Sequence, residues 1–423
     1  MTCLSDTGSK DSKIRFHRST NRQQWMKIAL FENIHALASE EFRQRGHDVL
    51  STSNSRDATS KSAWRDTEIL GIRSRTHVSR ESMESAPNLL AIGCFCIGTN
   101  QVDLKAARER GIVVFNAPYS NTRSVAELTI AEIIALHRRL FEKSDALHRG
   151  VWDKSAAHAH EVRGRTLGII GYGHIGSQVS ILAEALGMRL IFYDIVPKLP
   201  LGNAIPMGSL IEVLSWSDIV TVHVPETPAT RGLIGRDQIT LMKPGALLIN
   251  NARGSVVDVE AVAEAIRSGH LGGAALDVFP HEPSSTEEMF ESALRGLPNV
   301  ILSPHIGGST EEAQANIARD VTTKLLRYLE HGATTSAVNM PDVDLPHMRP
   351  QQHRILHFHR NVPGVLSKMH RILADLGINI NAEYLQSDME ISYVILDVDP
   401  VDHPAIIEGL KSIPETIRVR TLW

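Results

Sequence analysis

The chain has 423 residues, a formal net charge of −4 and 42% hydrophobic residues. This composition can build several hydrophobic cores, but it offers no basic surface of the kind that binds nucleic acids or anionic membranes. No apolar stretch approaches the roughly 20 residues of a membrane-spanning helix, and the first residues lack the apolar segment of a signal peptide.

The cysteines limit the possible sites further. Cys3, Cys94 and Cys96 are the only ones, which supports neither a disulfide framework nor a metal site. Cys94 and Cys96 flank Phe95 in a hydrophobic run, where a strand would turn both thiols to one face as small buried groups. We therefore predict no bound metal and a reduced, cytoplasmic compartment.

The first part of the chain alternates apolar runs with helical patterns. Residues 1–26 are polar and are predicted to form an extension outside the fold. The run MKIALF begins the first predicted strand, further strands are predicted at 68–74, 89–98 and 112–118, and helices are predicted at 35–47 and 102–111. This alternation is typical of a parallel sheet with helices on its faces.

A long helical pattern leads from this part to a second α/β unit. Residues 124–150 carry apolar residues at helical spacing and are predicted to form one long helix. The second α/β unit is expected over about residues 164–304. An amphipathic helix follows at 309–332, capped at Ser309 or Thr310. We expect this helix to return the chain to the first unit, which would then be discontinuous in sequence.

The end of the chain has the pattern of a separate small domain. Residues 340–350 contain three prolines and are predicted to be a linker. The elements predicted after it are strand 354–361, helix 362–377, strands 378–386 and 390–398, helix 403–413 and strand 416–422. Their order, βαββαβ, is that of the ferredoxin-like split.

A glycine-rich turn indicates a dinucleotide site. Gly171, Gly173 and Gly176 form a G-x-G-x-x-G motif between a predicted strand and a helix with one apolar face. Gly171 permits the tight turn, Gly173 lets the backbone approach a pyrophosphate, and Gly176 allows close packing of the helix on the sheet. Asp194 follows the next strand, where it suits the two hydroxyls of the adenosine ribose and would repel a 2′-phosphate. The motif therefore predicts NAD rather than NADP.

Three polar residues later in the chain each follow an apolar run. Arg253, Glu282 and His305 come after GALLIN, GAALDVF and VILSPHI. If these runs are neighbouring parallel strands, the three side chains meet at the carboxyl edge of the sheet. His305 would be the acid–base group, Glu282 would raise its pKa and fix its ring, and Arg253 would polarise a keto oxygen and bind a carboxylate. The arrangement predicts a redox site for a hydroxy acid and its keto acid.

Other residues are candidates for the same site. Asp277, at the end of a predicted strand, could accept the nicotinamide amide or could cap a turn. Arg73, Ser74 and Arg75 follow a strand of the first unit, where two arginines beside a hydroxyl could bind a carboxylate and a phosphate. Solvated arginines on a loop are the alternative. Gly98 could offer backbone N–H groups to a carboxylate.

Longer segments resemble a known family. GIRSRTH, AIGCFCIGTNQVDL, GIIGYGHIG, SPHIGGSTEEAQ and HRNVPGVL are similar to the D-3-phosphoglycerate dehydrogenases of the D-2-hydroxyacid dehydrogenase group, in their shorter bacterial form. The resemblance covers roughly residues 25–423, and the polar extension is the chief departure. It implies two Rossmann-like doubly wound parallel-sheet domains, one for substrate (27–120 and 308–345) and one for NAD (121–307), and a C-terminal ferredoxin-like ACT domain (351–423).

The resemblance also implies an activity and its residues. The reaction would be NAD-dependent oxidation of 3-phospho-D-glycerate to 3-phosphooxypyruvate, the first step of L-serine biosynthesis, and some members also reduce 2-oxoglutarate. Arg253, Glu282 and His305 would be catalytic, with Arg73, Ser74 and Arg75 at the substrate. The implied NAD contacts are His174, Ile175, Asp194, Asn251, Ala252, Arg253, Asp277, His305, Gly307 and Gly308.

Regulation and assembly follow from the same resemblance. Members of this type are usually homotetramers that L-serine inhibits. His359, Asn361 and Asn379 match the serine-binding positions, which lie between two paired ACT domains. At the start of the ACT helix, the residues after Asn361 are also a natural place for backbone N–H groups to hold a carboxylate. Trp152 matches a tryptophan near the hinge.

Two other functions remain open. Another D-2-hydroxyacid dehydrogenase would act on an unphosphorylated acid such as glycerate or lactate, but Arg73, Arg75 and the ACT unit favour a phosphorylated substrate. A non-catalytic sensor of NAD or of an amino acid could use the same fold. Such a sensor should have lost Arg253, Glu282 or His305, and all three are present.

Overall fold

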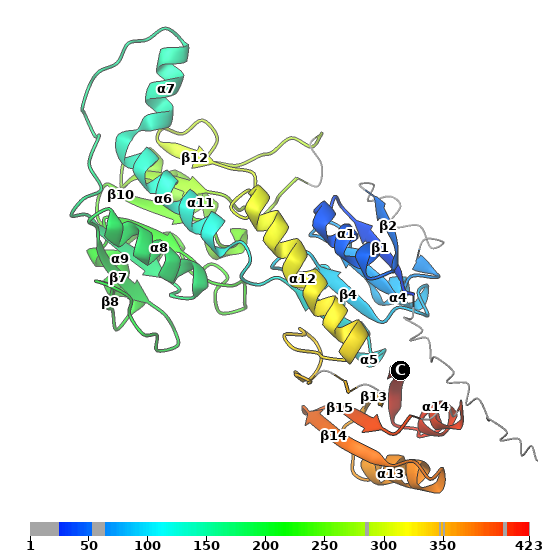
Figure 1. Ribbon diagram of the computed structural model, residues 1–423. Helices are drawn as coiled ribbons and strands as arrows, with labels where there is room; N and C mark the ends of the chain where they lie inside the picture. Colours follow the sequence, from blue (N-terminus) through cyan, green and yellow to red (C-terminus); the bar gives the residue numbers. More distant parts are fainter. Residues whose placement is uncertain are drawn as a thin grey trace, which may run out of the picture.

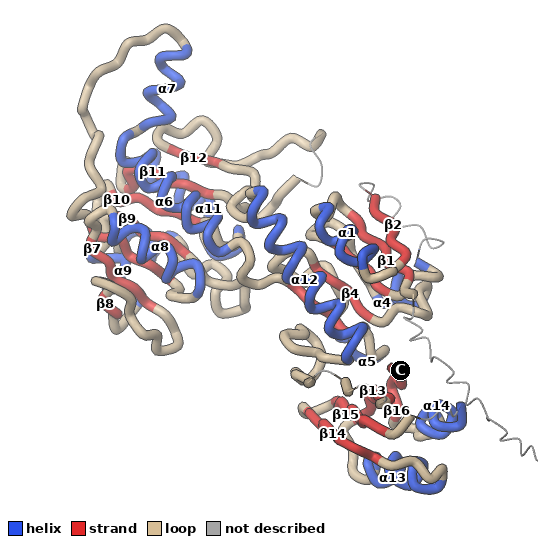
Figure 2. Tube along the Cα trace, viewed as in Figure 1, coloured by secondary structure: helices blue, strands red, loops and turns tan. Residues whose placement is uncertain are grey.

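The structure is a computed structural model that describes residues 25–52, 64–283, 287–346, 348–349, 352–400 and 404–422. Residues 1–24 of the predicted polar extension lie outside these ranges, and Met26 is already buried in the core. The described chain forms three β-sheets with helices packed on them (Figure 1, Figure 2). No helix in the described ranges is long and apolar enough to cross a membrane.

The first sheet is parallel, with strand order β2-β1-β3-β4-β5. Its strands are β1 (Lys27–Phe31), β2 (Asp48–Thr52), β3 (Ile69–Ile72), β4 (Ala91–Cys94) and β5 (Val113–Asn116), and its helices are α1 (Ala36–Gln44), α4 (Arg80–Glu84) and α5 (Leu104–Glu109). The sequence pattern does not predict β2, because this edge strand is polar and largely exposed. β4 ends at Cys94, so the prediction that Cys94 and Cys96 share a face of one strand is wrong.

The second sheet is also parallel, with order β12-β11-β10-β9-β6-β7-β8. Its strands are β6 (Thr166–Ile170), β7 (Arg189–Tyr193), β8 (Ile205–Pro206), β9 (Ile219–Val222), β10 (Ala246–Asn250), β11 (Leu271–Leu276) and β12 (Val300–Leu302). The helices between them are α8 (His174–Ala185), α9 (Leu210–Trp216), α10 (Arg236–Thr240) and α11 (Val259–Arg267). Helices cover both faces, so this unit is the predicted doubly wound Rossmann fold.

The long helix predicted over 124–150 is two helices. α6 (Thr122–Arg138) ends at Arg139, whose φ of 51° lies in the left-handed region, and α7 (Leu140–His148) starts in a new direction. The side chain of Arg139 bonds Glu142, which stabilises the turn. α6 packs on the second sheet, whereas α7 buries no residue and projects from the molecule (Figure 1).

The chain passes between the first two units twice, and the two crossings touch. Ser124 Oγ lies 2.9 Å from Thr310 Oγ1. A Cβ on Gly308 would come within 2.2 Å of Asn121 Nδ2, so a larger residue there would have to displace the Asn121 side chain. α12 (Glu311–His331) starts after the second crossing, with Thr310 as its N-cap, and packs on β4 and β5 of the first sheet.

The third unit has the predicted βαββαβ order. Its elements are β13 (His353–Arg360), α13 (Val365–Asp375), β14 (Ile380–Ser387), β15 (Ile391–Val398), α14 (Pro404–Lys411) and β16 (Thr416–Leu422). The antiparallel sheet has the order β14-β15-β13-β16. α13 and α14 cover one face of this sheet. The other face packs on α12 through Leu356, Phe358 and Tyr393, in one core shared with the first unit.

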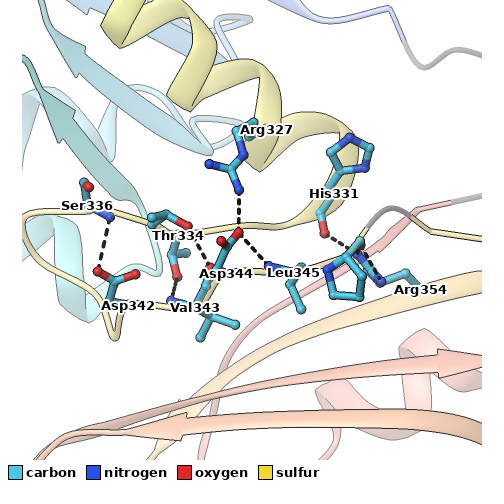
Figure 3. A network of polar contacts seen from close by, with 11 residues as sticks. Arg327, His331, Thr334, Ser336, Asp342, Val343, Asp344, Leu345 and Arg354 are labelled. Atoms are coloured by element: carbon cyan, nitrogen blue, oxygen red, sulfur yellow. Dashed lines mark hydrogen bonds and ion pairs between the residues drawn. The ribbon is translucent and has the colours of Figure 1, made fainter.

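The described residues of the predicted linker form neither helix nor strand, but hydrogen bonds hold them in place (Figure 3). Thr334 Oγ1 donates to Pro341 O and accepts from Val343 N. The carboxylate of Asp344 pairs with Arg327 on α12. At the end of the segment, the fully buried Arg354 donates to His331 O and binds Asp397 with both sides of its guanidinium, at 2.6 and 2.8 Å. These contacts attach the third unit firmly to α12.

Candidate active site and dinucleotide site

The predicted meeting of three strands at one sheet edge is confirmed. β10, β11 and β12 are parallel neighbours. A pocket of about 650 Å³ lies beyond their carboxyl ends, and its lining includes Arg253, Glu282 and His305. The three polar residues, which are far apart in the sequence, therefore share one cavity.

His305 and Glu282 form an ion pair in this pocket. His305 Nδ1 lies 2.8 Å from Glu282 Oε2, and the other carboxylate oxygen accepts from Phe279 N. The hydrogen bond and charge of Glu282 raise the pKa of His305, although burial and Arg253 oppose this rise. Burial would raise the pKa of Glu282, but the hydrogen bond and charge of His305 lower it overall. The pair therefore favours an imidazolium beside a carboxylate.

Asp277 fixes the backbone that carries the histidine. His305 has a φ of 55°, which is uncommon for a residue with a side chain, and its N–H donates to Asp277 O at 2.8 Å. The carboxylate of Asp277 accepts from Ser303 Oγ, Ile306 N and Gly307 N. Asp277 thus holds the loop after β12 in its strained form, and both suggestions for this residue, turn cap and amide acceptor, stay compatible with its position.

The turn after β10 is closed by its own side chains. Asn250 Oδ1 accepts from Ala252 N, and Asn250 Nδ2 donates to Arg253 O. Arg253 Nη1 donates to Ala252 O at 2.7 Å. The guanidinium keeps its remaining N–H groups for the pocket, which it lines together with Glu282 and His305.

The glycine turn has the shape that a pyrophosphate needs. Gly171 has a φ of 90°, and a Cβ there would come within 2.5 Å of His223 O. A Cβ on Gly176 would come within 2.2 Å of Gly171 O, whereas the space around Gly173 is open. Gly173 is also the N-cap of α8, and no side chain caps that helix. Its first N–H groups are thus available to an anion, which fits a dinucleotide phosphate.

Residues around this turn connect it to both units. Asp194 Oδ2 accepts from Tyr172 N at 2.8 Å, so the carboxylate at the end of β7 steadies the glycine turn. The exposed ring of His174 lies 3.9 Å, between centroids, from the ring of Tyr119 in the first crossing. Ile175 is half-buried against the core under α8. Among the described residues, no group of three or more His, Cys, Asp or Glu could hold a metal ion.

The candidate substrate residues lie outside the pocket described above. Arg73, Ser74 and Arg75 follow β3, and Gly98 follows the neighbouring β4, at the carboxyl edge of the first sheet. They and the pocket are on two different units. Burial raises the pKa of the nearby Cys96 to about 11, and the charges of Arg73 and Arg253 both oppose this rise. The charge of one arginine from each unit therefore acts on the same thiol.

Two residues that the sequence patterns did not single out hold this arginine loop. Glu32 accepts backbone hydrogen bonds from Arg73 N (3.2 Å), Arg75 N (3.0 Å) and Thr76 N (2.7 Å). Gln101 Nε2 donates to Arg73 O at 2.7 Å from the other side. Glu32 directly follows β1, so its place at the carboxyl edge of the sheet was a signal that could have identified it.

One chain does not bring the three candidate serine residues together. Asn361 follows β13 at the end of the sheet where Arg360 pairs with Ile391, whereas Asn379 precedes β14 at the end where Ile380 pairs with Val398. The two asparagines are thus at opposite ends of the sheet. His359 is buried near the Asn361 end, and its Nε2 has no partner among the described residues.

Comparisons with known proteins show which proteins the chain is similar to. Residues 130–307 match the NAD binding domain of the D-isomer specific 2-hydroxyacid dehydrogenases, and residues 355–418 match the ACT domain like that of the AHAS small subunit. A D-3-phosphoglycerate dehydrogenase from Haemophilus influenzae is 52% identical over 401 residues, which are 94% of this chain and 97% of that protein.

Solved structures that match about three quarters of the chain are also similar. The TT0316 protein from Thermus thermophilus is 34% identical, with a TM-score of 0.67 over 74% of this chain and all of that one. A D-lactate dehydrogenase from Aquifex aeolicus, solved with NAD and lactic acid, is 27% identical, with a TM-score of 0.65 and the same coverage.

Proposed function

Because the chain belongs to the D-3-phosphoglycerate dehydrogenase family, we propose that it oxidises 3-phospho-D-glycerate to 3-phosphooxypyruvate with NAD⁺, the first step of L-serine biosynthesis. The single observation that carries the proposal is the pocket at the carboxyl edge of the second sheet, which Arg253, Glu282 and His305 line together. NAD⁺, when bound, supplies the acceptor for the hydride that leaves C2 of the substrate.

His305 is the group that moves the proton. Its Nδ1 is engaged by Glu282, so Nε2 remains to take the proton of the substrate hydroxyl during oxidation and to return it during reduction. Glu282 stabilises the imidazolium that forms and keeps the ring in place. The arrangement is that of an acid–base couple oriented by a carboxylate.

Arginines from the two units bind the anionic substrate. Arg253 binds the carboxylate and polarises the C2 oxygen, because a guanidinium offers a planar fork of donors. Arg73 and Arg75, with Ser74 between them, contact the substrate from the first sheet, and Gly98 adds backbone N–H groups. A substrate with a carboxylate and a phosphate can engage both sets, which favours the phosphorylated acid over lactate or glycerate.

The second unit holds the dinucleotide. The N–H groups at the start of α8 receive the pyrophosphate, since Gly173 leaves that approach open. Asp194 receives the adenosine ribose. The other residues that would contact NAD are His174, Ile175, Asn251, Ala252, Arg253, Asp277, His305, Gly307 and Gly308.

Regulation by L-serine is the proposed task of the ACT unit. His359 and Asn361 of one chain would bind L-serine together with Asn379 of a second copy. The separation of the two asparagines along the sheet supports a site shared by two chains, because a two-fold arrangement can place opposite ends of two sheets side by side. We expect serine to lower turnover more than substrate affinity, by changing how the units close.

The exposed apolar surface of the second unit supports self-association. α7 buries no residue within the chain, and Phe141, Leu147 and the 76% exposed Trp152 present apolar surface on and after it. We propose that this surface packs on a second copy and that paired ACT units extend the assembly to a homotetramer. The described cysteines, Cys94 and Cys96, are free thiols, and we place the enzyme in the cytoplasm.

NADH formation from 3-phosphoglycerate, with and without L-serine, tests the whole proposal. We expect turnover with 3-phosphoglycerate, slower turnover with glycerate, and inhibition by millimolar serine. Equal preference for glycerate would favour another D-2-hydroxyacid dehydrogenase. NAD binding without any turnover would favour a non-catalytic sensor. NADH consumption with 2-oxoglutarate, measured in the same preparation, tests the proposed side reaction.

A further inference from the structure

A buried carboxyl group without a role in this mechanism lies on α6 (Thr122–Arg138), the helix that packs on the second sheet. Glu132, on α6, is 3% exposed, and its Oε2 accepts a hydrogen bond from Asn251 Nδ2 at 2.6 Å. The same Nδ2 donates to Thr129 Oγ1, one turn earlier on α6, at 3.0 Å. Thr129 gives its own hydroxyl proton to Val125 O, so it can only accept from Asn251. The side-chain amide of Asn251 is therefore fixed to α6 by two hydrogen bonds.

The fixed asparagine belongs to the turn that carries Arg253. Asn250 closes this turn through Ala252 N and Arg253 O, as described above. Asn250 to Arg253 therefore behave as one small rigid segment. The side chain of Asn251 joins this segment to α6, the helix that comes directly from the first crossing. A shift of Asn251 relative to α6 would carry Arg253 with it.

We propose that Glu132 is a positioning residue for the reaction: through Asn251, it sets the place of Arg253 over the pocket. The proposal rests on the function proposed above, because the place of Arg253 affects a rate only if Arg253 binds the reacting acid. Glu132 does not itself line the pocket. Its effect therefore passes through Asn251 and not through contact with substrate.

The surroundings of Glu132 favour a neutral carboxyl group. In the described part of the chain, no cation acts on the pKa of this carboxyl group, and its Oε1 is buried without a hydrogen-bond partner. Burial raises the pKa of Glu132 to about 8; the Asn251 hydrogen bond opposes this rise and the charge of Asp277 adds to it. A glutamine has the same shape and also offers a neutral acceptor, so it should replace Glu132 in this role.

Kinetics of three variants test the proposal. Glu132→Gln should keep kcat/KM for 3-phosphoglycerate within about threefold of wild type, whereas Glu132→Leu should lower it at least about tenfold, the scale of one lost hydrogen bond. The Kd for NADH, from fluorescence, should change by less than about threefold in both. Thr322→Val is the matched control, because Thr322 is a fully buried polar residue of α12 away from the pocket. An equal loss in Thr322→Val, or none in Glu132→Leu, would overturn the proposal.

A double mutant separates positioning from general stability. Asn251→Ala should reproduce the loss of Glu132→Leu, and the pair together should lose no more than the larger single effect, because both act through one contact. Additive losses would contradict the proposed route. If Glu132→Leu does not fold, Asn251→Ala and Glu132→Gln carry the test: the first should lose at least about tenfold in kcat/KM, and the second should stay within about threefold of wild type.

Amide hydrogen exchange gives a readout that needs no substrate. Exchange at residues 252–254 should be faster in Glu132→Leu than in wild type and unchanged in Glu132→Gln, with the core strands unaltered. If the variants differ from wild type in exchange as expected but wild type does not oxidise 3-phosphoglycerate, the proposed function fails, while the link from Glu132 to the Arg253 turn stands. If wild type is active and all variants exchange as wild type does, the positioning role fails and the proposed function stands.

Discussion

Arg108 on α5 forms an ion pair with Asp388 in the turn between β14 and β15. The same turn receives two hydrogen bonds from Asn361, whose N–H donates to Glu390 O at 2.8 Å and whose Nδ2 donates to Asp388 O at 2.6 Å. A residue of the proposed serine site and a residue of the first unit thus hold one turn between them. Movement of Asn361 on binding serine would reach α5 by this contact.

Arg108→Ala should weaken inhibition by serine and leave uninhibited turnover unchanged. Because Arg108 joins the turn to α5, its loss should raise the serine concentration for half inhibition by about fivefold or more, the usual range of coupling between sites. Inhibition curves of NADH formation measure this shift. Arg80→Ala is the control, since Arg80, on α4, forms an exposed ion pair with Glu109 of α5 and not with the turn. Identical curves for both variants and wild type would contradict the coupling.

Glu32→Gln should weaken substrate binding without affecting NAD. Three backbone N–H groups of the arginine loop converge on the Glu32 carboxylate, and an amide offers one acceptor oxygen in place of two. We expect KM for 3-phosphoglycerate to rise about tenfold or more, the scale of a lost hydrogen bond to a charged group. Steady-state kinetics measure it. Glu68→Gln, whose carboxylate accepts from Lys27 N at the opposite end of the sheet, should behave as wild type.

His305→Ala should remove the acid–base group and spare the cofactor site. Hydride transfer should fall by about 10²–10⁴-fold, the typical contribution of general acid–base catalysis. NADH binding, followed by fluorescence, should be retained, because the glycine turn lies on another loop. A loss of less than tenfold in kcat would show that another group moves the proton.

The pH dependence should depend on Glu282. Oxidation needs neutral His305, so its rate falls as the pH drops below the raised pKa of that histidine. Glu282→Gln removes the hydrogen bond and charge that raise this pKa, and the acidic limb of kcat/KM should move to lower pH. Reduction needs protonated His305, so its alkaline limb should move to lower pH as well. Profiles measured in both directions that stay in place would exclude the assigned pair.

Asp397→Ala should strongly destabilise the protein. Arg354 has no exposed side-chain surface and binds both oxygens of Asp397, so the variant leaves a buried charge without its partner. Such losses cost about 3–5 kcal/mol. Asp344→Ala is the matched control, because its ion pair with Arg327 is largely exposed and should cost less than about 1 kcal/mol. Urea unfolding of both variants gives the comparison.

The spacing of apolar residues and the positions of the glycines were sufficient to predict much of the fold. The alternation of apolar runs predicts the parallel sheets, and the βαββαβ order of the last unit is confirmed. The break at Arg139 was not predictable, because a residue other than glycine adopts the left-handed conformation there and the apolar spacing continues across it. The end of β4 was not predictable for a similar reason: the hydrophobic run continues through Cys96, but the strand ends at Cys94.

The candidate site was predictable where each residue follows a strand. Arg253 and His305 could be brought together from the sequence because parallel strands deliver their carboxyl ends to one edge. Glu132 gives no such signal, since a glutamate on an amphipathic helix is ordinarily solvated, and its burial depends on which face α6 turns to β10. The distance between Asn361 and Asn379 likewise depends on strand pairing that the sequence pattern does not contain.

The core that α12 shares with the third sheet affects how the chain can be shortened. Truncation after α12 would remove Arg420, which lies over the ring of Tyr328 and donates to Leu329 O, and so would strip the cover from the C-terminal end of the helix. The excised ACT fragment would in turn bare Leu356, Phe358 and Tyr393 to water. Apolar patches of this kind promote aggregation. The regulatory unit is thus built into the scaffold of its neighbour and is not a detachable module.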